Sequence, residues 1–103
     1  MTDNRRTSTR HDVSFSATIT ISGTQRHAKL INLSLGGALV ETGTTHALGE
    51  RMQIAFGVPT ADEPIEVGAT VRWADGNGVG LQFDGLRARD VWALNEYFKQ
   101  QPS

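Results

Sequence analysis

The stretch that decides the fold is residues 65–83, IEVGATVRWADGNGVGLQF. Five alternating apolar positions run from Ile65 to Trp73, and three more run from Val79 to Phe83. A period of two is typical of a β-strand that buries one face. The segment between them, residues 75–78, contains the Asp-Gly and Asn-Gly pairs that favour tight hairpin turns. These residues therefore predict a β-hairpin.

The rest of the chain continues this pattern and then changes it. Alternating or short apolar runs predict four further strands, at residues 13–22, 28–33, 38–42 and 52–56. After Gly85 the period lengthens, because Val91, Leu94 and Phe98 are three and four residues apart. That spacing predicts a helix over residues 86–99. We expect an all-β fold, a six-stranded antiparallel β-barrel with one C-terminal α-helix whose apolar stripe covers one barrel opening.

Composition excludes several classes of protein. The 103 residues carry ten Lys and Arg against eleven Asp and Glu, so a basic surface that wraps duplex nucleic acid is not expected. The absence of cysteine excludes disulfides, thiolate catalysis and zinc sites built on sulfur. The first residues do not resemble a signal peptide, and no apolar run approaches the roughly 20 residues that span a bilayer. We expect a cytoplasmic domain with no membrane insertion.

Arginine is concentrated at the start of the chain. Three of the eight arginines, Arg5, Arg6 and Arg10, fall in the first ten residues, which are polar and aperiodic. We expect residues 1–10 to form a flexible arm and residues 11–103 to form the barrel and helix. A basic arm of this kind is often simply solvated, and an excess of arginine can reflect base composition. Guanidinium groups also grip phosphates bidentately and stack on bases.

No catalytic constellation is present. Ser34 lacks the glycine two positions earlier that a nucleophile elbow needs, and the three histidines have no metal-ligand spacing. The glycine-rich segment 76–80 leads into a predicted strand, whereas a phosphate-binding loop needs a helix there. The sequence therefore predicts a protein that is not an enzyme and uses no metal or cofactor.

Two short motifs are informative together. Arg6 and Arg10 form Arg-x-x-x-Arg before the first strand, and Asn32, Ser34 and Gly37 form Asn-x-Ser-x-x-Gly between the second and third. Each alone is ordinary, since Asn, Ser and Gly are common turn residues. In this order, and with this pattern of strands and a closing helix, the chain resembles the PilZ domain over nearly its whole length. PilZ domains are bacterial receptors for cyclic di-GMP.

The resemblance implies a role for each motif residue. Arg6 and Arg10 would grip the phosphates and guanine edges of cyclic di-GMP, and Asn32 and Ser34 would hydrogen-bond a guanine. Gly37 would let the backbone approach the ligand. Because Asn32 is neutral where many family members have aspartate, we expect some affinity to be lost.

Three further residues bear on the ligand. Arg5 precedes the first motif, and a third arginine there tends to accompany two intercalated ligands in PilZ domains, so we expect two cyclic di-GMP molecules per domain. Trp73 is in phase with the buried face of its strand, which favours a core position, but it also resembles a tryptophan that stacks on guanine. Trp92, in the predicted helix, is expected to pack against the barrel.

The resemblance also implies an adaptor, a monomer or weak dimer, that orders its arm on binding ligand and signals to an unidentified effector protein. Biofilm, motility or polysaccharide control is the usual setting. Two alternatives stay open. One is a PilZ-like module that binds only protein; the other is a small barrel that binds single-stranded nucleic acid. The latter needs aromatic and basic residues together on one face, whereas Lys29 and Arg72 are expected to lie outward without aromatic neighbours.

Overall fold

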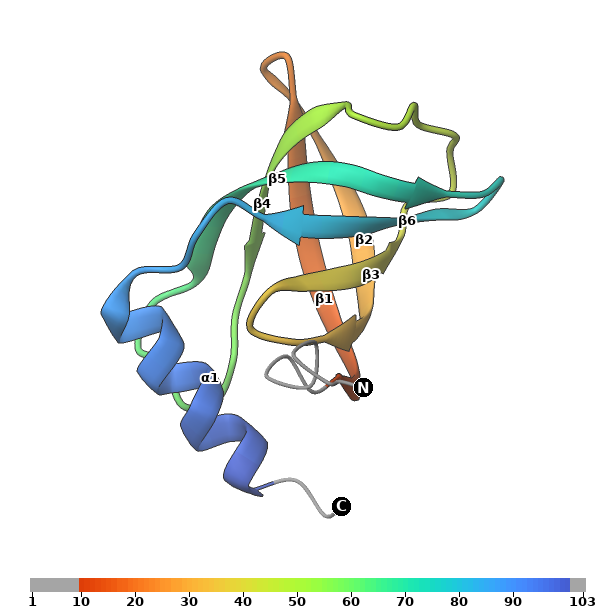
Figure 1. Ribbon diagram of the computed structural model, residues 1–103. Helices are drawn as coiled ribbons and strands as arrows, with labels where there is room; N and C mark the ends of the chain where they lie inside the picture. The colour runs from red at the N-terminus through yellow and green to blue at the C-terminus, as the bar shows by residue number, and fades with distance from the viewer. Residues whose placement is uncertain (1–9, 101–103) are drawn as a thin grey trace, which may run out of the picture.

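The computed structural model describes residues 10–100. Its elements are strands β1 (His11–Ile21), β2 (Thr24–Leu33), β3 (Gly37–Glu41), β4 (Arg51–Phe56), β5 (Ile65–Ala74) and β6 (Gly78–Phe83), followed by helix α1 (Ala88–Gln100). The strands close into an antiparallel barrel in the order β1-β2-β3-β6-β5-β4 (Figure 1). The predicted six-stranded barrel with one C-terminal helix is confirmed. The predicted arm lies outside the described residues, apart from Arg10.

The first hairpin is longer than the sequence predicted. Its two-residue turn, Ser22 and Gly23, has φ of 51° and 84°, the positive values that match the twist of a hairpin. Strand β2 therefore starts at Thr24, directly opposite Ile21, rather than at residue 28. Residues 24–27 are polar and exposed, so they lack the apolar alternation that predicts a strand. They form a strand because they pair with residues 18–21 of β1.

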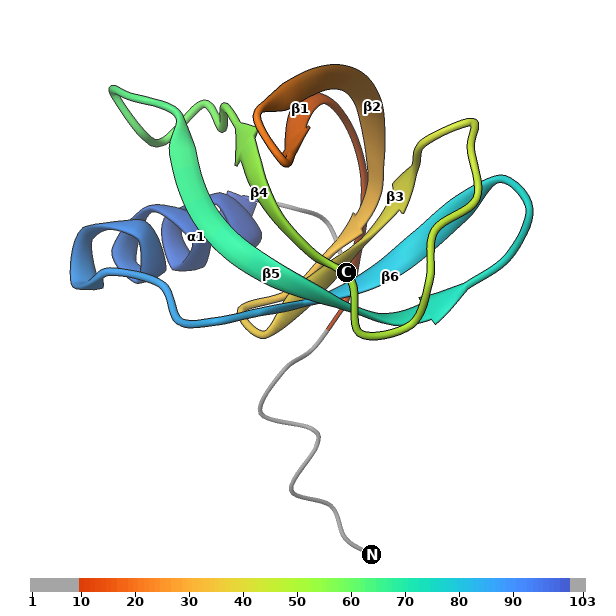
Figure 2. The same ribbon diagram turned by 90° about the horizontal axis from the view of Figure 1, so that it is seen from above.

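The core fills the barrel and extends beneath the helix. Alternate residues of each strand point inward, and Figure 2 shows the strands curling round this interior with α1 to one side. The largest fully buried side chains are Ile19, Leu30, Leu33, Val40, Ile54, Ile65, Val71, Val79 and Leu94. Burying one such side chain contributes about 1.5–3 kcal/mol, so this set dominates the stability of the domain.

Helix α1 presents most of the predicted face to the core. Ala93 and Leu94 are buried and Phe98 packs against the core, but Val91 is only partly buried. Trp92 is 61% exposed, so the expectation that it packs against the barrel is wrong. At the start of the helix the buried residue is Asp90 in place of Val91, and its carboxylate accepts hydrogen bonds from the Arg87 backbone N–H (3.4 Å) and from the Arg87 Nε (3.2 Å).

The helix also lies against the start of β1. Strand β4 pairs with β1 only over residues 17–20, so residues 11, 12, 15 and 16 of β1 pair with β2 alone, and residues 13 and 14 lie in a bulge between them. Here His11 stacks on Phe98 with ring centroids 3.9 Å apart, and Phe15 meets Tyr97 at 5.4 Å. The C-terminal half of α1 is thereby attached to the residue that follows Arg10.

Candidate ligand-binding groove

The turn between β2 and β3 is organised around one hydroxyl group. The Ser34 Oγ accepts the backbone N–H groups of Gly36 and Gly37, both at 3.2 Å, and donates to the Gly37 carbonyl at 3.3 Å. The Ser34 backbone N–H donates to the same carbonyl at 2.9 Å. Ser34 is 5% exposed. Ser34, which the sequence predicted to contact the ligand, therefore has a structural role, because its hydroxyl group fixes the conformation of the turn.

Gly37 is required where the turn enters β3. A Cβ atom at this position would collide with the backbone carbonyl oxygen of Leu81 on the neighbouring strand β6. The reason for glycine is thus the close approach of two strands, and the turn can pass beside β6 only without a side chain there. The Gly36 carbonyl accepts the Phe83 N–H at 2.9 Å and attaches the turn to the same strand.

A β-bulge decides where Trp73 points. On β5, Val71 pairs with Leu81 and Trp73 pairs with Gly80, so β5 has one more residue than β6 over this step. A bulge of this kind changes which face the following side chains occupy. Val71 is fully buried whereas Trp73 is 52% exposed, so the core interpretation of Trp73 is wrong. A Cβ on Gly80 would lie 3.2 Å from the Trp73 Cβ, so glycine leaves room for the indole.

These features surround a groove of about 740 Å³, within the range of small-molecule sites. Eleven residues line it: Arg10, Ser34, Gly36, Gly37, Ala38, Leu39, Arg72, Trp73, Gly80, Leu81 and Gln82. The structure therefore brings together four of the residues predicted from the sequence, from the position just before β1, the β2–β3 turn and β5. Arg5 and Arg6, also predicted for this site, lie outside the described residues.

The charge of the groove is positive. Two of its eleven described residues are arginines, and none is acidic. Arg72 is exposed, as expected, but it lines the groove together with Trp73, so the expectation that it has no aromatic neighbour is wrong. The same bulge explains the error, because it moves the tryptophan off the buried face. A planar cation and an exposed indole are suited to a ligand that carries both phosphate and a flat ring system.

Asn32 lies beside the groove instead of lining it. It pairs across the strands with Leu39, which does line the groove, and its Nδ2 donates to Asp12 Oδ1 at 3.1 Å. Its own Oδ1 is buried and has no hydrogen-bond partner. Sequence reasoning treated Asn32 as a neutral substitute for aspartate and overlooked Asp12. The strand register of β1 and β2, in which these two residues are directly opposite, supplies a carboxylate at this place.

Over residues 10–100, no cluster of three or more histidine or acidic side chains suited to a metal ion occurs. In the same described part of the chain, no helix is both long and apolar enough to cross a membrane.

The sequence profile of the PilZ domain matches residues 4–100 of the chain. The chain belongs to the PilZ domain family. Among curated proteins no sequence matches this PilZ domain. The sequence resemblance that rested on two motifs and a strand pattern is thus confirmed at the level of the family.

Three solved structures share the fold of this PilZ domain. The Bacillus subtilis inhibitor of motility, MotI/DgrA, has a TM-score of 0.76 at 19% identity, over 97% of this chain and 55% of that one. The PilZ domain of YcgR from Escherichia coli with c-di-GMP has a TM-score of 0.70 at 14% identity, over 93% and 91%. Borreliella burgdorferi PlzA in complex with c-di-GMP has a TM-score of 0.64 at 20% identity, over 81% and 32%. This chain thus spans about half of MotI and a third of PlzA.

Proposed function

We propose that this PilZ domain is a receptor for cyclic di-GMP, which binds in the groove beside Trp73, and that it signals to a protein partner without catalysing a reaction. The observation that carries the proposal is that Arg10, Arg72 and Trp73 all line the groove, whose eleven lining residues include no acidic side chain. The YcgR and PlzA structures, which share the fold, hold c-di-GMP. The ligand has two phosphates and two guanines, which matches two cations and an aromatic platform.

The arginines supply the charge that the phosphates need. Arg10 and Arg72 line the groove, and we assign the same task to Arg5 and Arg6 on the family pattern. Bidentate contacts from guanidinium to phosphate are charge-assisted and about twice as strong as neutral hydrogen bonds. With Arg5 included, the arginines offset much of the charge of about -4 that two intercalated ligands carry, and we propose two molecules per domain.

Guanine recognition is assigned to the β2–β3 turn and its neighbours. The carboxylate of Asp12, an exposed residue that holds the Asn32 amide, is an acceptor beside the groove. The unpartnered Oδ1 of Asn32 is a second acceptor, but it is buried, so we propose that the Asn32 side chain turns when a guanine binds. The N1–H and N2–H edge of guanine offers donors to acceptors of this kind. Because the Ser34 hydroxyl already has three partners in the turn, we propose that it contributes mainly by holding Gly36 and Gly37 in place.

Isothermal titration of cyclic di-GMP into the full chain tests the proposal. We expect binding with a ratio near two, and a loss of about ten- to a hundredfold for Arg10→Ala. Arg26→Ala is the matched control, because Arg26 is an exposed arginine of β2 that does not line the groove. Its affinity should equal that of the unmodified chain.

The same titration separates the alternatives. No heat and no shift of melting temperature with cyclic di-GMP would leave a PilZ fold that binds only protein. A basic groove with an exposed tryptophan could also accept a single nucleotide strand. Short oligo-dT, titrated over a salt series, therefore serves as the second ligand, and tight salt-dependent binding that cyclic di-GMP does not compete with would overturn the receptor assignment.

A further inference from the structure

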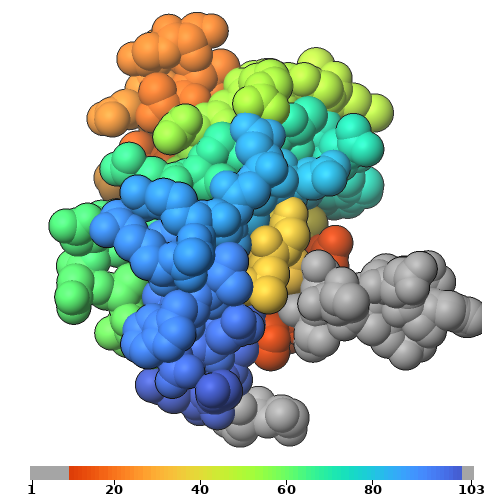
Figure 3. All heavy atoms as spheres, turned by 60° about the vertical axis from the view of Figure 1, so that its left-hand side comes forward, coloured from red at the N-terminus to blue at the C-terminus, as the bar shows by residue number. Residues whose placement is uncertain are grey.

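Trp92 is an exposed tryptophan with no task in the barrel or in the ligand groove. It lies on α1 and is 61% exposed, whereas the next two residues, Ala93 and Leu94, are buried. Exposed tryptophans are uncommon on free surfaces and frequent at the centres of protein interfaces. Figure 3 shows α1, in blue, alongside the green loop that precedes β5. Trp92 is part of the hollow between these two segments.

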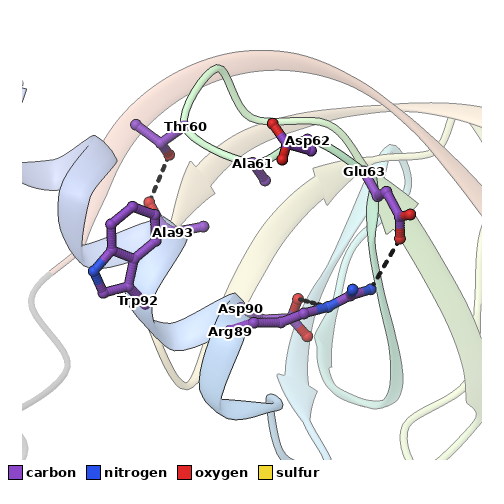
Figure 4. A pocket seen from close by; sticks show the side chains of 8 residues that line it. All are labelled: Thr60, Ala61, Asp62, Glu63, Arg89, Asp90, Trp92 and Ala93. Atoms are coloured by element: carbon purple, nitrogen blue, oxygen red, sulfur yellow. Dashed lines mark hydrogen bonds and ion pairs between the residues drawn. The ribbon is translucent and has the colours of Figure 1, made fainter.

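The hollow is a small pocket with walls that are already fixed. Its volume is about 240 Å³, and it is lined by residues 60–63 of the loop and by Arg89, Asp90, Trp92 and Ala93 of the helix (Figure 4). Thr60 Oγ1 donates to the Ala93 carbonyl at 2.6 Å, next to Trp92. At the other end, Arg89 Nη2 donates to Glu63 Oε1 at 3.2 Å. The loop and the helix are thus tied together on both sides of the opening.

The lining favours a cation. It contains the carboxylates of Asp62, Glu63 and Asp90. Glu63 pairs with Arg89, and Asp90 pairs with Arg87 at 3.2 Å and with Arg89 at 3.9 Å, so these two carboxylates already have guanidinium partners. Within the described residues, Asp62 makes no hydrogen bond or ion pair, and Figure 4 shows it at the upper rim across from Arg89. An indole face attracts a Lys or Arg head group, and neighbouring carboxylates strengthen the preference.

The size of the pocket indicates what kind of cation. A volume of about 240 Å³ is below the roughly 300–1,000 Å³ of sites that enclose a whole small ligand, but it can hold one long side chain. We propose that this pocket receives a Lys or Arg side chain presented by a different protein, with Trp92 as the aromatic wall and Asp62 as the charge partner. It shares no lining residue with the ligand groove, so it can be tested without cyclic di-GMP.

Nuclear magnetic resonance on the full, ¹⁵N-labelled chain tests the inference. The probes are N-acetyl-arginine amide and N-acetyl-lysine amide, with N-acetyl-citrulline amide as the neutral analogue of the arginine probe. We expect both cations to shift the Trp92 indole N–H and the amides of residues 60–63, with a dissociation constant on the order of 1–10 mM. Citrulline should leave these signals in place, and added salt should weaken the cations.

Two variants and a control make the result specific. Asp62→Asn and Trp92→Leu should each weaken the arginine probe about two- to fivefold. Glu41→Gln removes one exposed negative charge from β3, outside the pocket, and should change nothing. If Trp92→Leu does not fold, Asp62→Asn decides the question alone.

The inference is overturned if citrulline and arginine shift the same signals equally, or if Trp92 stays unmoved at tens of millimolar of either cation. It is also overturned if the Trp92 signals move when the protein alone is concentrated, because the occupant is then a second copy of this chain.

Discussion

Replacing Ser34 by alanine should lower stability as well as ligand affinity. The Ser34 Oγ serves two N–H donors at 3.2 Å and one carbonyl at 3.3 Å, all within the turn. Alanine removes these bonds and leaves part-buried N–H groups of Gly36 and Gly37 without that acceptor. The bonds are long, so each contributes near the lower end of about 0.5–1.5 kcal/mol, and the loss of the acceptor adds to this. We expect a cost of about 1–3 kcal/mol.

Thermal unfolding followed by circular dichroism measures that cost. For a domain of this size, 1 kcal/mol corresponds to about 4–8 °C, so the melting temperature should fall by roughly 5–20 °C. Ser16→Ala is the matched control, because Ser16 is an exposed serine of β1, and it should melt like the unmodified chain. Affinity for cyclic di-GMP, measured well below the melting temperature, should fall less than in Arg10→Ala. Unchanged melting with a loss as large as that of Arg10→Ala would refute the reasoning, since Ser34 would then act as a ligand contact.

Three further outcomes are expected. Gly37→Ala should cost about 3 kcal/mol or more in urea denaturation, because the new methyl group collides with the Leu81 carbonyl; a cost below about 1 kcal/mol would contradict this. Trp73→Ala should change stability by less than about 1 kcal/mol but weaken cyclic di-GMP by about five- to a hundredfold in calorimetry, the cost of one lost stacking contact. Hydrogen bonds from Arg51 hold the pKa of Asp84 below its ordinary value, so this pair stabilises the fold above the ordinary pKa and stops doing so as the pH falls through the lowered one. Arg51→Ala should raise the pKa of Asp84 in a carboxyl-carbon titration, and an unchanged titration would show that the pair does not form in solution.

The architecture could be predicted because its evidence is local. Alternation of apolar residues marks each strand that buries one face, and the change of period after Gly85 marks the helix. Residues 24–27 were not predicted as part of a strand, because they are polar on both faces and form a strand only through pairing with β1. The family could be recognised because its two motifs are short, ordered and attached to identifiable strands.

The groove could be predicted only in part, because its geometry depends on register. Nothing in the local sequence marks the extra residue of β5 that turns Trp73 outward. From the sequence, Trp73 could therefore be placed either in the core or on a guanine, and Arg72 was expected to have no aromatic neighbour. Asp12 was missed for the same reason, since only the pairing of β1 with β2 brings it opposite Asn32. On the helix, the position of Trp92 depends on the rotation of α1 against the barrel, and the spacing of apolar residues defines that rotation only to within about one residue.

The aromatic contact between α1 and β1 has a consequence for solubility. Residues 11–16 of β1 have ladder partners on one side at most, and an unprotected strand edge of that length is a template for pairing between chains. Phe98 stacks on His11 and Tyr97 makes a tilted contact with Phe15, so the C-terminal half of α1 packs against this segment. The helix therefore covers apolar and aromatic side chains at the one stretch of the closed barrel where β1 has a single ladder partner. Loss of α1 should appear first as aggregation, before any loss of the barrel itself.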